Sequence, residues 1–155
     1  MRFGKDGGAH WLYSVRGDFT SRHYNINDLG YFRRPNDYGS VLELRYRETV
    51  PSKFFRGWVV RGFQHWRWNF DGVKLFTDNN LRANAVWRNY WETSLSLNYS
   101  APAFDDRETR GLGLYKKPEQ WRASFEIDSD NRKPIFATLD FTRTHEQEAD
   151  RIGLE

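Results

Sequence analysis

Arginine, histidine and acidic side chains recur at every second position through much of this chain, and their chemistry could serve a function. Side chains of a strand point alternately to its two faces, so this spacing gathers the charged groups on one face of a sheet. If that face lines a water-filled lumen, its guanidinium and carboxylate groups would filter or bind solutes by charge. The candidate solute contacts are Arg45, Arg47, Arg61, His65, Arg67, Arg82, Arg122 and Glu126. An alternative stays open at each position, in which the face is solvated or opposite charges on neighbouring strands compensate one another.

No group of residues has the spacing that catalysis or metal binding requires. Glycoside hydrolysis needs two carboxyl groups at a set separation, and the adjacent acids Asp105, Asp106 and Glu108 do not fix one. The same run lacks the alternating ligands and the sharp glycine turn of a calcium loop. The histidines show no metal-ligand spacing, no serine lies in a nucleophile elbow, and the absence of cysteine excludes thiolate chemistry. We therefore expect no catalytic residue, no metal and no cofactor.

The charged positions belong to a sheet whose other face is apolar, and the pattern is clearest between residues 57 and 99. Two alternating runs are separated there by Asp71-Gly72, which predicts a tight hairpin because glycine accepts a positive φ. Similar runs elsewhere predict about seven antiparallel strands in meander order. The expected strands cover residues 9–20, 39–49, three stretches within 57–99, 120–129 and 135–142.

Aromatic residues make up 17% of the chain, whereas hydrophobic residues of all kinds make up only 38%. The large aromatics fall towards strand ends and small or aliphatic residues fall mid-strand, which is the aromatic-girdle pattern of a membrane protein. A sandwich core would place its largest side chains centrally, where they bury most surface. The predicted lipid-interface aromatics are Trp11, Trp58, Trp66, Trp68, Trp87, Trp91 and Trp121.

Connections between the expected strands alternate between long and short. Residues 21–38 and 101–118 are long polar loops, and the strands on either side of Asp71-Gly72 are long enough to project beyond a bilayer. Long loops on one side and short turns on the other are typical of outer-membrane barrels. We see no signal peptide and expect the polar segment from Thr144 to Glu155 not to form a barrel strand, so we expect an internal piece of a longer precursor.

Three motifs at strand–loop junctions resemble, in order, a family of bacterial outer-membrane β-barrels catalogued as domain-of-unknown-function family 5916. The motif residues are Asn27, Asp28, Gly30, Tyr31, Arg33, Arg34, Arg110, Gly111, Asp130 and Arg132. In that family a large barrel follows an N-terminal domain similar to family-nine carbohydrate-binding modules. The resemblance implies that this chain is an interior fragment of such a barrel, without the signal peptide and the carbohydrate-binding domain. The chain departs from the pattern at Leu112, where the family has a second glycine, and the resemblance supplies no reaction.

We therefore predict a single all-β domain over residues 1–155, forming a segment of a transmembrane β-barrel in the cell outer membrane that binds or passes solutes. The expected partners are the lipid bilayer, the remainder of a larger barrel and, from the resemblance, carbohydrate. Lys and Arg exceed Asp and Glu by only 3 (24 against 21) with both signs interleaved, so we expect no nucleic acid. The competing class is a soluble antiparallel β-sandwich or half-barrel that binds glycans, and a glycoside hydrolase-associated domain ranks third. A second sheet packed on the apolar face would favour the sandwich.

Overall fold

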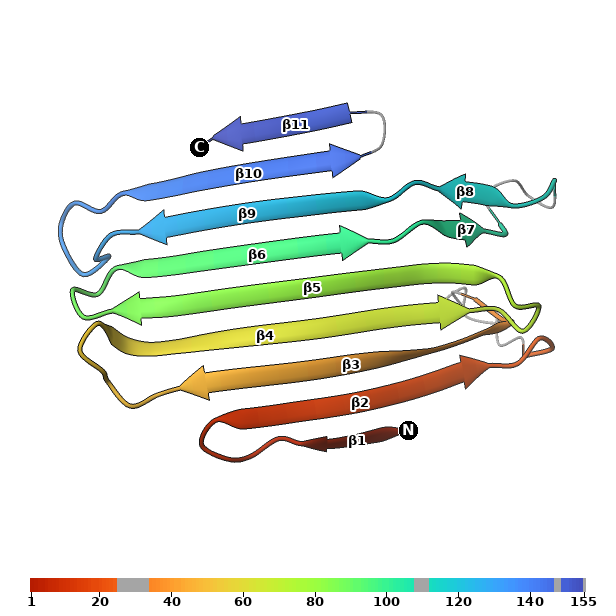
Figure 1. Cartoon of the computed structure of the whole chain (residues 1–155), viewed down its shortest axis with the longest axis horizontal. Helices are drawn as coiled ribbons and strands as arrows, with labels where there is room; N and C mark the ends of the chain where they lie inside the picture. The colour runs from red at the N-terminus through yellow and green to blue at the C-terminus, as the bar shows by residue number, and fades with distance from the viewer. Residues whose placement is uncertain (25–33, 108–111, 147–148, 155) are drawn as a thin grey trace.

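A computed structural model describes residues 1–24, 34–107, 112–146 and 149–154, and in these ranges the fold is all-β. Nine strands form one antiparallel sheet in the order β1-β2-β3-β4-β5-β6-β9-β10-β11, and β7 and β8 form a separate two-stranded hairpin (Figure 1). The strands are β1 (Arg2–Lys5), β2 (Trp11–Thr20), β3 (Asp37–Glu48), β4 (Phe55–Trp68), β5 (Lys74–Trp87), β6 (Glu92–Ser100), β7 (Ala103–Asp105), β8 (Tyr115–Lys117), β9 (Gln120–Asp128), β10 (Thr138–Glu146) and β11 (Ala149–Leu154).

All seven expected strands are present, and the antiparallel meander order is confirmed. Four strands were not expected: β1 and β11 at the two edges, and the β7–β8 hairpin inside the loop predicted over 101–118. The expectation that the segment from Thr144 onward forms no strand is wrong, because β10 continues to Glu146 and pairs with β11. The last predicted strand also begins later than residue 135, since the Ser129 amide bonds to the Ala137 carbonyl and keeps the preceding residues in the turn.

The register puts the predicted apolar positions of the sheet on one face and the predicted charged positions on the other, except that Lys74 pairs with Trp68 beyond a register shift at the end of β4. Directly paired residues share a face, and one such row across the strands runs Tyr13–Leu44–Gly62–Leu81–Leu97–Ala123. We call these two surfaces the apolar face and the polar face. Arg143 is an exception, because it pairs with Ala123 and therefore belongs to the apolar face by register.

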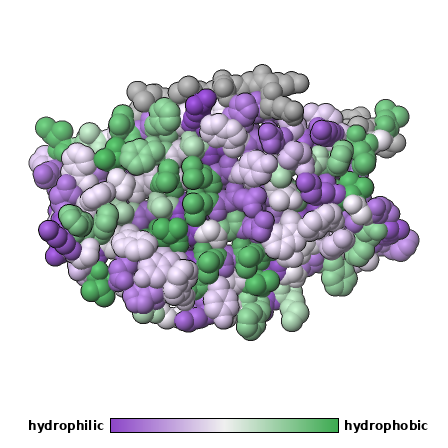
Figure 2. Space-filling model, in the orientation of Figure 1, coloured by the Kyte–Doolittle hydropathy of each residue, from purple (hydrophilic) through white to green (hydrophobic). Residues whose placement is uncertain are grey.

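The sheet is a single layer, and no second sheet covers it in the described part of the chain. The chain exposes 11435 Å² of surface, whereas a compact monomer of 18.6 kDa exposes about 8,200 Å². Leu12, Leu75 and Ala103 are the buried hydrophobic residues, and mid-strand leucines such as Leu44 stay 47% exposed. In Figure 2, hydrophobic side chains gather in a band that crosses the strands near the middle of the sheet. The strands β1 and β11 are the edges and do not pair with each other, so the described sheet is open.

The two ends of the sheet differ in their connections (Figure 1). At one end, which we call the loop end, β2 joins β3, β4 joins β5, and β6 joins β9 through the β7–β8 hairpin. We call the opposite end the turn end. The β4–β5 hairpin is closed by Asn69, which is 3% exposed and accepts bonds from the amides of Asp71 (3.0 Å) and Val73 (2.9 Å). Gly72 supplies the positive φ of this turn, at 80°. No helix in the described residues is long and apolar enough to cross a membrane.

Candidate functional site

All eight candidate solute contacts lie on the polar face, although they are distributed over four strands. Those on β3, β4 and β5 share that face by direct pairing or by strand alternation, and Arg122 and Glu126 join them from β9. The structure therefore brings them onto one surface but does not gather them at one point. Three local arrangements on that surface have different chemistry.

Arg67 is fully compensated by two carboxylates from neighbouring strands. Its Nη2 donates to Asp18 Oδ2 on β2 at 2.6 Å, and its Nε donates to Asp37 Oδ2 on β3 at 2.8 Å. Asp37 is only 5% exposed, so the guanidinium supplies the charge that a buried carboxylate needs. The alternative of cross-strand compensation therefore describes Arg67, and its role is to join β2, β3 and β4 at the loop end.

Three arginines lie directly opposite one another in the middle of the polar face. Arg45 on β3 pairs with Arg61 on β4, and Arg61 pairs with Arg82 on β5; we call these three residues the arginine row. Glu43 is the carboxylate beside the row, 2.9 Å from Arg45 and 3.8 Å from Arg61. Among the described residues Arg82 has no ion-pair partner and its side chain is exposed. Cross-strand compensation of the arginine row is therefore partial, because the row has one carboxylate beside it for three guanidinium groups.

A hollow of about 650 Å³ adjoins the row on the side of β6, β9 and β10. Arg82 and Arg122 line it together with the hydroxyl groups of Ser96 and Ser124. The acids Glu126 and Asp140 line it as well, and they pair directly across β9 and β10. The hollow thus has cationic, hydroxylated and acidic portions.

The predicted interface aromatics within strands lie on the apolar face near the strand ends. At the turn end, Trp11, Tyr46 and Trp58 form a row across β2, β3 and β4, with ring centroids 4.8 and 5.1 Å apart. At the loop end, Tyr38 lies between Trp68 (6.1 Å) and Phe70 (5.2 Å). Trp66, Trp87 and Trp121 also face this side by register, whereas Trp91 lies in the β5–β6 turn.

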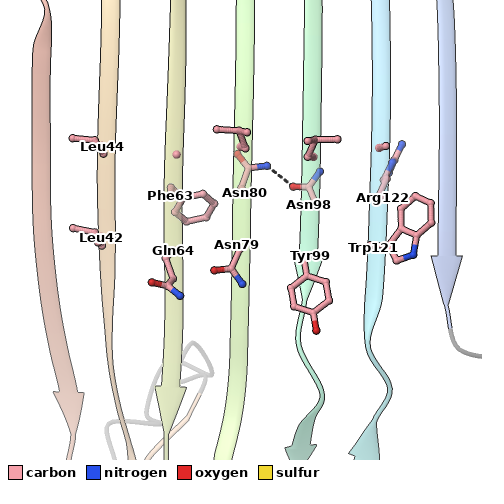
Figure 3. A pocket seen from close by; sticks show the side chains of 14 residues that line it. Leu42, Leu44, Phe63, Gln64, Asn79, Asn80, Asn98, Tyr99, Trp121 and Arg122 are labelled. Atoms are coloured by element: carbon pink, nitrogen blue, oxygen red, sulfur yellow. Dashed lines mark hydrogen bonds between the residues drawn. The ribbon is translucent and has the colours of Figure 1, made fainter.

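The apolar face has a depression of about 560 Å³ that extends across β3, β4, β5, β6 and β9, and Gly62 is one of the residues that line it (Figure 3). Nothing lies within 4 Å of the position that a Cβ on Gly62 would occupy. Gln64 and Asn79, the two amides on this face, pair directly at the loop side of the depression, in the same row as Tyr99 and Trp121. These two amides therefore lie in a row that has Leu42 at one side and Tyr99 and Trp121 at the other.

Of the motif residues, Arg34, Asp130 and Arg132 lie within the described part of the chain, and Asn27, Asp28, Gly30, Tyr31, Arg33, Arg110 and Gly111 lie outside it. Arg34 forms an ion pair with Asp106, whose other oxygen accepts a bond from Asn69 at 3.1 Å. Asp106 thus ties the β6–β9 connection to the β4–β5 hairpin at the loop end. Its two oxygens are thus both engaged by neighbouring side chains.

Asp130 and Arg132 stabilise the turn between β9 and β10. Arg132 donates from Nε and Nη2 to the two Asp130 oxygens, each at 2.7 Å, and this pairing lowers the pKa of Asp130 to about 2. The same guanidinium lies 3.1 Å from the ring centroid of Tyr90, and Arg56 lies 4.1 Å from that centroid. Tyr90, at a φ of 66°, thereby links the β5–β6 and β9–β10 turns with the start of β4.

Sequence reasoning missed several residues that hold this surface together. Alternation assigns Asp18 to the polar face, and Asp37 lies at the end of the loop predicted over 21–38. Their shared contact with Arg67 depends on the strand register, which alternation does not give. Nothing in the spacing of residues around Tyr90 indicates its role. A turn of only a few residues between two long strands does indicate that one of the turn residues takes a positive φ.

The family model described as "Domain of unknown function (DUF5916)" matches residues 1–155, the whole chain. No curated protein and no solved structure matches it.

Proposed function

The chain belongs to the DUF5916 family, and from the geometry of its sheet we propose that it forms a segment of an outer-membrane β-barrel whose polar face binds or passes solutes. In this proposal the apolar face contacts lipid and the polar face contacts water inside the barrel. The remainder of a larger barrel would pair with the two edges, β1 and β11, whose outer sides have no neighbouring strand in the described sheet.

The observation that carries the proposal is an apolar face that no second layer covers and whose aromatic residues are spaced as in lipid-facing strands. On β4, Trp58 precedes Trp66 by eight residues and Trp68 by ten, which is about 26–33 Å along the strand. Strands tilted by about 40° would bring that separation to about 20–25 Å along the bilayer normal, close to the apolar band of about 25 Å in known barrels. Leucine, valine and alanine occupy most of the positions between these aromatic rows, with Gly62 and the amides Gln64 and Asn79 as the exceptions on β4 and β5.

The competing glycan-binding sandwich needs a second sheet against the apolar face. In the described residues the only other sheet is the β7–β8 hairpin, which extends beyond the ends of β6 and β9 (Figure 1). Carbohydrate as the solute rests on the family resemblance alone.

The test is the behaviour of the full chain in plain buffer and in nonionic detergent, followed by far-UV circular dichroism and sedimentation. We expect aggregation in buffer and a monodisperse β-protein in detergent. A monodisperse chain that melts cooperatively in plain buffer would remove the lipid contact and move the glycan-binding module to first place.

A further inference from the structure

We infer that the arginine row binds a solute carrying two or three oxyanion groups, such as carboxylates or phosphates, spaced about 5 Å apart. The inference deepens the proposed function by naming the class of solute, and it rests on that function only in requiring a wet polar face. Neighbouring strands lie about 4.8 Å apart, so three guanidinium groups in one row span about 10 Å. A planar guanidinium fork matches a carboxylate or a phosphate with two parallel hydrogen bonds.

The first support is an uncompensated charge at a position where sheets ordinarily avoid one. Like charges directly opposite each other on neighbouring strands are destabilising. Here Arg45, Arg61 and Arg82 follow one another without an intervening acid in the row, and Glu43 serves both Arg45 and Arg61. Two of the three positive charges therefore have no protein counter-charge in the described residues, which an anionic solute would supply.

The second support is a contrast with two other arginines, whose guanidinium groups are held by carboxylates at short distance. Arg67 contacts two carboxylates, and Arg132 holds Asp130 through two bonds of 2.7 Å. Arg47 and Arg122 on the polar face also form no ion pair among the described residues, so the row is distinguished by the direct opposition of its three arginines. Arg61 and Arg45 keep 40% and 36% of their side chains exposed, so both remain accessible to a solute.

The third support is the set of neutral hydrogen-bonding groups around the row. Ser96, Ser124 and Thr142 continue the same line of pairs across β6, β9 and β10. Asn80 and Asn98 are bonded to each other in the next row towards the loop end, where Arg122 follows them (Figure 3). Glu126 and Asp140 lie farther along the hollow and would repel an anion there, which confines the solute to the side of the arginines.

The experiment measures binding of two probes, tripolyphosphate and tricarballylate, to the full chain folded in nonionic detergent by titration calorimetry. Tighter binding of tricarballylate identifies a carboxylate solute, and tighter binding of tripolyphosphate identifies a phosphoryl solute. Arg82→Gln removes a guanidinium that has no protein partner, and we expect it to weaken the tighter probe about tenfold or more. Arg61→Gln should weaken it by a similar factor.

Arg88→Gln is the matched control, because it removes the same charge from an exposed residue outside the row, and it should leave the affinity unchanged. No binding of either probe would overturn the inference, as would equal weakening by Arg82→Gln and Arg88→Gln, which would indicate only a response to net charge. Circular dichroism of each variant checks that its β-structure is retained. Anion binding by a chain that proves soluble in plain buffer would keep this inference and discard the lipid contact.

Discussion

Lysine placed at Ala83 should destabilise the chain in a bilayer far more than lysine placed at its neighbour Asn84. Both residues lie inside β5, but Ala83 belongs to the apolar face and Asn84 to the polar face. Ala83 pairs with Val60, which is two residues from the midpoint between Trp58 and Trp66 on β4. A lysine on the lipid face costs about 2–4 kcal/mol at the bilayer midplane and less towards the interface. We expect about 2 kcal/mol for Ala83→Lys, or about 30-fold in the folding equilibrium.

Asn84→Lys should cost less than about 1 kcal/mol, which is the loss of the hydrogen bond that Ser94 donates to Asn84 at 2.9 Å. Urea titration of the chain in lipid vesicles, followed by tryptophan fluorescence, measures both values. Two small and equal costs would show that the apolar face is not in lipid. Two large and equal costs would show that the polar face is not in water, and either result would refute the assignment of the faces.

Three further predictions concern the stability of the sheet, and urea titration in detergent measures each. Gly39→Ala should destabilise the folded chain by about 1–3 kcal/mol, because the added Cβ would lie 2.5 Å from the Trp66 carbonyl oxygen. Gly62→Ala should be tolerated, because its added Cβ meets open space. Equal effects of the two substitutions would contradict the register. Arg67→Gln should cost about 1–3 kcal/mol, because it leaves a nearly buried carboxylate without its cation, and a neutral result would show that this contact contributes nothing. The pKa of Asp130 is lowered from 3.8 to about 2, so its contribution to the free energy of unfolding is present above about pH 4 and disappears as the pH falls towards 2. Asp130→Asn should therefore reduce the change in the free energy of unfolding between pH 4 and pH 2. An unchanged pH dependence would contradict the pairing with Arg132.

The two faces could be predicted from the sequence because strand alternation is local and survives folding. Trp58, Arg61 and Arg82 lie on the faces that their parity predicts. The edge strands could not be predicted in this way. Arg2–Lys5 has no alternating pattern, and it becomes a strand because its backbone pairs with β2, which is a tertiary effect that overrides local preference.

The arginine row also lies beyond what parity alone predicts. Alternation places Arg45, Arg61 and Arg82 on one face, but their direct opposition depends on the register of two strand pairs. Register follows from turn geometry and from pairing across the whole sheet, and a shift of two residues would preserve every face while dispersing the row. The same reason explains why the contacts of Arg67 with Asp18 and Asp37 were not anticipated.

The most direct measurement of the lipid contact is a spin-label scan along β3 in vesicles. The chain contains no cysteine, so single cysteines at positions 41 to 46 can each be labelled without interference. Lipid-soluble oxygen should reach labels at 42, 44 and 46, and a water-soluble nickel complex should reach labels at 41, 43 and 45. Access of the nickel complex to all six positions would contradict the lipid contact, and protection of 42, 44 and 46 from both reagents would indicate a protein layer on the apolar face.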